Sequence, residues 1–186
     1  MHISETIKSR RSIKKFAERP VTQQEIETLL EAAVLAPNHH LTQPWRFYVL
    51  GPEARHGYGL ALGDRKARKM EDAVAAQAVR AKVADEHRAL PAMIAVAVVH
   101  NDNAEIREED YAAVMMAIEN LSLTAVSLGL GTHLKTGAIM SDPAARAVVG
   151  LPENERIVAI VNVGAPLEVP APRARRAATE LTVWVP

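Results

Sequence analysis

The strongest constraint on the fold is a continuous apolar run at 92–99, Ala-Met-Ile-Ala-Val-Ala-Val-Val. A run rich in β-branched residues with no polar position predicts a strand that is buried on both faces. A second buried strand is predicted at 157–163. Between them, apolar residues recur at spacings of three and four from Tyr111 to Leu128, which predicts a long central helix. With 186 residues, the chain is expected to form one α+β domain.

Composition excludes several classes of protein. Lys plus Arg and Asp plus Glu number 22 each, which argues against a general nucleic-acid or membrane-surface binder. The absence of Cys excludes disulfide scaffolds, thiolate nucleophiles and Cys-ligated metal sites. No apolar run approaches the ~18 residues of a membrane span, and the first residues lack the apolar core of a signal peptide. We therefore expect a cytoplasmic protein, and the scarcity of aromatic side chains suggests that a subunit interface supplies part of the buried surface.

Local signals place the remaining elements. Thr22, followed three residues later by Glu25, predicts a capping box at the start of a helix. A first strand is expected at 45–50, and the Ala-rich, charged stretch 53–88 is expected to be helical. The chain ends in an apolar segment, 181–185, with the pattern of a strand.

A cluster of positive charge follows the first predicted helix. It comprises Lys8, Arg10, Arg11, Lys14 and Lys15, with Ser12 among them. Guanidinium groups suit phosphate oxygens, and a Ser hydroxyl adds a further donor. Basic residues in the last turn of a helix also complement its dipole without any ligand, so both interpretations stay open on the residues alone.

The segment from Pro37 to Trp45, Pro-Asn-His-His-Leu-Thr-Gln-Pro-Trp, joins a helix end to a strand. It is either a rigid surface loop with Trp45 as a core anchor, or a loop that presents polar groups to a ligand beside the sheet. His39 and His40 are adjacent, so we expect them to point in different directions. They also lack the i, i+4 spacing of a helical metal pair. We expect no metal site here or among the other, scattered histidines.

Three segments in order resemble the nitroreductase family of flavin enzymes: Arg-Arg-Ser-Ile-Lys-Lys-Phe at 10–16, the helix at 20–37 ending in Ala-Pro, and Gln-Pro-Trp-Arg-Phe at 43–47. The long central helix, the glycine turn at 129–131 and a closing Gly-x-Pro with basic residues and a terminal strand agree with that family. The resemblance covers nearly the whole chain.

The resemblance implies a nitroreductase-like α+β fold. It has a central, mostly antiparallel sheet flanked by helices, a long central helix and a C-terminal arm. Residues 1–186 would form a single FMN-binding domain, and two copies would form a homodimer with FMN at the subunit interface. Residues implied to bind the cofactor are Arg10, Arg11, Ser12, Lys14, Pro37, Asn38, His39, Leu134, Lys135, Thr136, Arg173 and Arg175. Of these, Pro37, Asn38 and His39 would reach the flavin from the partner subunit.

The implied function is an FMN-dependent NAD(P)H oxidoreductase. Hydride from NADH or NADPH would pass through FMN to a small electrophilic acceptor, such as a nitro compound or a quinone, in a ping-pong cycle. The chemistry would belong to the flavin, so no catalytic side chain is expected. Leu41 stands where larger members carry Asn, and no Pro-x-Glu-Gly stretch is present. The alternatives are a non-catalytic FMN carrier or sensor, and a protein that binds another phosphate ligand.

Overall fold

The computed structural model describes residues 2–186; Met1, the first residue of the expected domain, lies outside the described part. A four-stranded sheet with the order β1-β2-β4-β3 forms its centre, and all three strand pairings are antiparallel. The elements are α1 (Ile3–Ser9), α2 (Gln23–Ala33), β1 (Trp45–Val49), α3 (Pro52–Ala67), α4 (Ala73–Arg88), β2 (Ala92–Val99), α5 (Ala104–Ser127), β3 (Gly131–Lys135), α6 (Pro143–Val149) and β4 (Glu155–Gly164), with short 3₁₀ turns at Ala138–Ser141 and Ala178–Glu180.

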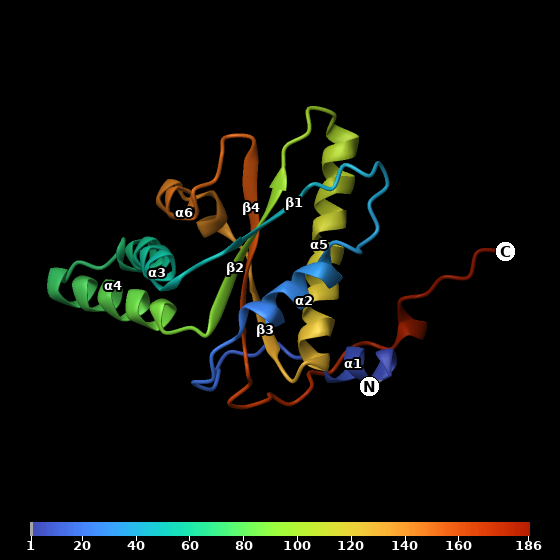
Figure 1. Ribbon diagram of the computed structural model, residues 1–186, viewed down its shortest axis with the longest axis horizontal. Helices are drawn as coiled ribbons and strands as arrows, with labels where there is room; N and C mark the ends of the chain where they lie inside the picture. Colours follow the sequence, from blue (N-terminus) through green and yellow to red (C-terminus); the bar gives the residue numbers. More distant parts are fainter. Residues whose placement is uncertain (1) are drawn as a thin grey trace.

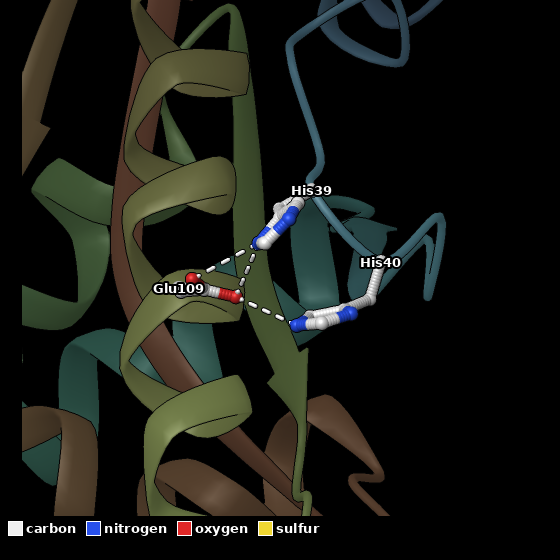
Figure 2. Close-up of side chains that lie close together, drawn as sticks. All are labelled: His39, His40 and Glu109. Carbon is white, nitrogen blue, oxygen red and sulfur yellow. Dashed lines mark hydrogen bonds and ion pairs between the residues drawn. The ribbon is translucent and has the colours of Figure 1, made fainter.

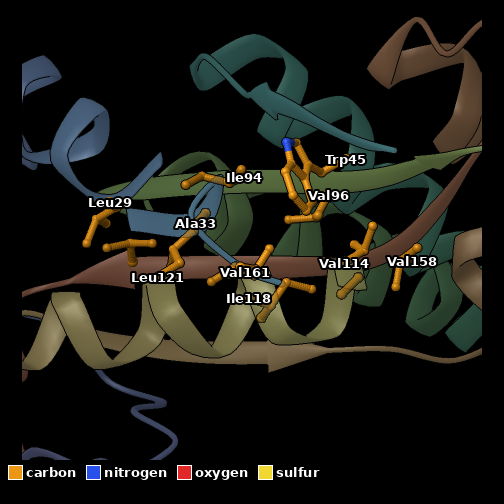
Figure 3. Close-up of a cluster of buried hydrophobic side chains, with 14 of the residues drawn as sticks. Leu29, Ala33, Trp45, Ile94, Val96, Val114, Ile118, Leu121, Val158 and Val161 are labelled. Carbon is orange, nitrogen blue, oxygen red and sulfur yellow. The ribbon is translucent and has the colours of Figure 1, made fainter. Parts of the chain in front are cut away.

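Helices cover both faces of the sheet, as the apolar run at 92–99 predicts. Helices α2 and α5 lie on one side, and α3, α4 and α6 lie on the other (Figure 1). Side chains of β2 alternate between the layers: Ile94 and Val96 join the core under α2 and α5, whereas Met93 and Ala95 join the core under α3 and α6. The first of these cores is drawn in Figure 3, where Trp45 packs against the same layer.

Two predicted features are confirmed in detail. The capping box forms, with Thr22 Oγ1 accepting from the Glu25 amide and the Glu25 carboxylate accepting from the Thr22 amide. The central helix α5 is longer than predicted, because it starts seven residues before Tyr111, where Asn103 caps its first turn. No described helix combines the length and the apolar character that a membrane span requires.

Two expectations need correction. The helical stretch 53–88 is two helices, α3 and α4, which break at 68–72 and pack side by side. The strand expected at 181–185 does not form: the backbone of this segment runs away from the body of the molecule (Figure 1), and its side chains are exposed. Within residues 2–186, this segment belongs to no sheet and so lacks the hydrogen-bonding partner that a strand needs.

Candidate functional site

An open pocket of about 770 Å³ lies between the end of α1, the edge strand β3 and the C-terminal arm, which we define as residues 166–186. Two basic clusters contribute to its wall: the N-terminal cluster after α1, and the pair Arg173 and Arg175 in the arm. The lining residues are Ile7, Lys8, Arg10, Arg11, Ser12, Lys14, His133, Leu134, Glu168, Pro170, Ala171, Pro172, Arg173 and Arg175.

The N-terminal half of the pocket is fixed by the segment that follows α1. Ser12 forms an isolated parallel bridge with Thr132 of β3, and the Ile13 amide donates to the Thr132 carbonyl at 2.8 Å. This contact requires Gly131, because a Cβ there would lie 2.3 Å from Ile13 Cγ1. The segment therefore rests directly on the end of the sheet and turns Ser12 and its basic neighbours toward the pocket.

The C-terminal arm is attached to the same segment. The Leu167 amide donates to the Lys15 carbonyl at 3.0 Å, and Lys15 Nζ pairs with Glu168 at 3.0 Å. From this attachment the arm runs past the pocket and brings Arg173 and Arg175 to its wall. Two basic clusters about 160 positions apart in the sequence thus meet in one place.

The charge of the pocket favours an anion. Its wall carries six cationic side chains and a single carboxylate, Glu168, which is already paired with Lys15. Arg10 is held by an ion pair of 3.4 Å with Glu119 on α5. Guanidinium and ammonium groups gathered around a shared space form strong, charge-assisted hydrogen bonds with phosphate oxygens.

Arg11 bears on both interpretations of the basic cluster. One terminal nitrogen, Nη1, donates to the carbonyls of Lys8 at 2.6 Å and Arg10 at 2.8 Å, so the side chain caps the end of α1. Its Nε is buried and has no hydrogen-bond partner among the described residues. A buried donor without a partner is unfavourable unless a ligand accepts from it, so this atom fits an anionic group in the pocket.

Strand β3 contributes unequally to the pocket. Leu134 and His133 line it, while the Lys135 side chain turns away and its Nζ lies 3.2 Å from His87 Nε2 on α4. Burial lowers the pKa of Lys135, and the charge of Lys66 lowers it further. Thr136 does not line the pocket either. Contact of Lys135 and Thr136 with a cofactor through their backbone stays a prediction.

His133 is a pocket residue that the sequence did not single out. Burial lowers the pKa of its imidazole, and the positive charges of Lys135 and Lys14 lower it further. The ring is therefore neutral near pH 7 and provides one donor and one acceptor. The sequence could have pointed to His133, because it directly precedes Leu134, a predicted site residue, and adjacent residues of a strand lie close to the same site.

Pro37, Asn38 and His39 lie away from this pocket. His39 Nδ1 contacts Glu109 near the start of α5, whereas Arg10 contacts Glu119. These ten residues of helix correspond to about 15 Å along the axis. Within one chain, the structure therefore brings together the N-terminal and C-terminal basic residues but not the loop residues.

The loop at 37–43 is held from within by Asn38. Its side-chain oxygen accepts from the Gln43 amide at 2.7 Å, and its Nδ2 donates to Thr42 Oγ1 at 3.1 Å. Leu41 and Gln43 adopt positive φ values of 51° and 47°. Thr42 Oγ1 also donates to the buried carboxylate of Asp110, which ties the loop to α5.

The expectation that the adjacent histidines of this loop point in different directions is wrong. His39 and His40 both turn toward Glu109, and their ring centroids lie 4.3 Å apart (Figure 2). Thr42, between Leu41 and Gln43 with their positive φ values, ties the loop to α5, the helix that carries Glu109.

Comparison with known proteins agrees with this architecture. The model of the nitroreductase family matches residues 7–165. YfhC of Bacillus subtilis, provisionally named as an NAD(P)H nitroreductase, is 32% identical over 173 residues, which cover 93% of this chain and 89% of that protein. A nitroreductase-like family protein from Bacillus cereus has a TM-score of 0.85 at 28% identity and covers 100% of this chain and 96% of its own.

A further solved structure shares the fold. It is a provisionally named nitroreductase from Desulfovibrio desulfuricans in complex with FMN, with a TM-score of 0.74 at 24% identity, covering 99% of this chain and 96% of its own. The family match runs from the last turn of α1 through the end of the sheet, and the similarity in structure extends over the C-terminal arm. On this evidence, the chain belongs to the nitroreductase family.

Proposed function

We propose that this chain is an FMN-dependent NAD(P)H oxidoreductase that reduces a small electrophilic acceptor, such as a nitro compound or a quinone. The observation that carries the proposal is the convergence of two basic clusters on one pocket of about 770 Å³. The name of the Bacillus subtilis relative and the FMN complex of the Desulfovibrio structure support it.

In this proposal the FMN phosphate and ribityl chain are held by residues from both walls of the pocket. The buried, unpartnered Nε of Arg11 is the atom that most directly fits an acceptor. The other groups bring hydrogen-bond donors to the same space: the arginines have planar guanidinium forks that suit bidentate contact with a phosphate, the lysine adds an ammonium group and the serine a neutral hydroxyl. These groups are Arg10, Ser12, Lys14, Arg173 and Arg175.

Bound FMN would supply the redox chemistry, accepting a hydride from NADH or NADPH and passing reducing equivalents to the acceptor in ping-pong order. The side chains bind and orient. His133, which is neutral near pH 7, offers a hydrogen bond beside Leu134, and the arm segment 170–172 covers part of the pocket and reduces its exposure to water. No side-chain nucleophile is required.

The proposal includes a homodimer, supported by apolar surface that this chain leaves uncovered. Val183, Trp184 and Val185 of the arm are 85–90% exposed, and Ile3 and Ile7 of α1 are also exposed. Exposed apolar patches of this kind mark interaction surfaces. The 37–39 loop lies about 15 Å from the same chain's pocket along α5, so it would contribute to a flavin site through the partner subunit.

Steady-state kinetics test the proposed activity. With FMN-loaded protein, initial rates at several fixed concentrations of a quinone or nitro acceptor should give parallel double-reciprocal lines against NAD(P)H. Bound flavin with no NAD(P)H oxidation would instead favour a carrier or sensor.

Sedimentation of the wild type and of Trp184→Glu tests the dimer: the wild type should sediment as two chains and the variant should shift toward one. A monomeric wild type would contradict the assembly.

A further inference from the structure

A cluster of two histidines and one glutamate lies at the opposite end of α5 from the basic pocket. His39 Nδ1 lies 3.1 Å from both carboxylate oxygens of Glu109, and His40 Nε2 lies 3.0 Å from Oε2 (Figure 2). One ligand atom from each of the three residues lies within 4.8 Å of the others. Neither His40 nor Glu109 has a part in the proposed flavin site.

These separations suit a single metal ion. Bonds of about 2.0–2.1 Å from zinc to imidazole nitrogen and carboxylate oxygen, at tetrahedral angles, put neighbouring ligand atoms about 3.3 Å apart. The observed nitrogen-to-oxygen distances of 3.0 and 3.1 Å are close to that value. The two rings lie with their centroids 4.3 Å apart and both face one carboxylate, so a single dication between them would attract the carboxylate and bind one nitrogen of each ring.

The surroundings hold the three ligands in place. Asn38, directly before the histidines, closes the loop by accepting from the Gln43 amide. Thr42 anchors the loop to Asp110, the residue after Glu109 on α5. Contacts of this kind around the ligands orient them and raise affinity for a metal. All three ligand side chains are at least partly exposed, so an ion can enter from solvent.

We propose that His39, His40 and Glu109 form a site for a divalent transition metal of the zinc class. Two imidazoles and one carboxylate are a ligand set that Zn²⁺ accepts, with a fourth position left for water. His39 would bind through Nδ1, which leaves Nε2 as a separate group. Metal binding would fasten the 37–43 loop to α5. The site rests on this loop and helix and does not depend on the proposed flavin chemistry.

The test is calorimetric titration of Zn²⁺ into tag-free, EDTA-treated and dialysed protein carrying its own cofactor content. The wild type should bind one Zn²⁺ per chain. His40→Gln and Glu109→Gln should each weaken that binding at least about tenfold, because even loss of an outer-shell partner costs 10–100-fold. His100→Gln is the matched control, since His100 also lies beside a carboxylate, Asp102, at 3.7 Å, but without a third ligand. Its affinity should equal that of the wild type.

Three results would overturn the site. They are a wild type that binds less than one Zn²⁺ per chain, ligand variants that bind as tightly as the wild type, and a control that loses as much affinity as they do. Anomalous diffraction at the zinc edge gives an independent readout and should place the ion between the two imidazoles and Glu109. Zinc found elsewhere, with these residues empty, would also refute the proposal. Flavin content, read by absorbance in the same samples, should stay unchanged in His40→Gln.

Discussion

Arg173 offers the sharpest test of how the C-terminal arm contributes to the pocket. It lines the basic pocket and is exposed, so Arg173→Ala removes one positive charge without opening a cavity in the core. We expect the variant to fold with wild-type stability and to bind FMN more weakly. Its neighbour Arg176 does not line the pocket and pairs with Glu180 at 3.4 Å, which makes Arg176→Ala a matched control.

The magnitude follows from the type of contact. A hydrogen bond to a charged group contributes about 1.5–3 kcal/mol, and exposure of Arg173 to solvent favours the lower end of that range. Since 1.4 kcal/mol corresponds to a factor of ten, the dissociation constant for FMN should rise about tenfold in Arg173→Ala. The increase should shrink as salt is added, because the contact is partly open to screening ions.

Quenching of FMN fluorescence during titration into flavin-free protein measures the affinity, and thermal unfolding checks the fold. Arg176→Ala should bind FMN like the wild type at every salt concentration. An equal loss of FMN affinity in both variants would contradict a specific contact of Arg173, because general charge would then explain the effect. FMN binding by Arg173→Ala as tight as that of the wild type would contradict it as well.

Three further changes test the structure. Gly131→Ala should destabilise the protein by about 1–3 kcal/mol in urea unfolding, since its Cβ would meet Ile13 at 2.3 Å; wild-type stability would contradict this packing. Thr42→Val removes the hydroxyl that donates to the buried Asp110 carboxylate and should cost about 1–3 kcal/mol by the same assay; no loss would argue against this anchor. Burial lowers the pKa of His87, so below its unfolded value of 6.5 the unfolded chain binds the proton more readily. Stability should therefore decline as the pH falls below 6.5, and decline less in His87→Gln; equal slopes would refute this burial effect.

Much of the fold follows from local signals. The capping box at Thr22 forms as its local signal predicts, and the apolar run at 92–99 requires helices on both faces of its sheet. The break between α3 and α4 was not predicted. Gly59, which weakens a helix by propensity, is where α4 approaches, because a Cβ there would lie 2.6 Å from Ala84 Cα. The need for a glycine at this position comes from the packing of α4 against α3, which the sequence pattern of one helix does not show.

In the candidate site, too, local signals predict some features and tertiary contacts decide the others. Residue types identified the N-terminal basic cluster, and the family resemblance implied Arg173 and Arg175. The meeting of the two depends on the attachment of the arm to Lys15, which local patterns do not specify. The directions of His39 and His40 depend on the backbone of the loop and on Glu109, 70 positions away. The strand expected at 181–185 does not form because a strand needs a neighbouring strand, and the described part of the chain pairs none with it.

The most direct test of the central claim is an anaerobic visible absorption spectrum of the FMN-saturated protein, recorded before and after NADPH and then NADH are added. The proposed function predicts a flavin absorption band whose intensity matches the amount of FMN that the protein binds. The band should bleach with at least one nucleotide and return when a quinone or nitro acceptor is added. A band that persists with both nucleotides would contradict the oxidoreductase function. Failure to bind FMN would contradict the assignment of the basic pocket itself.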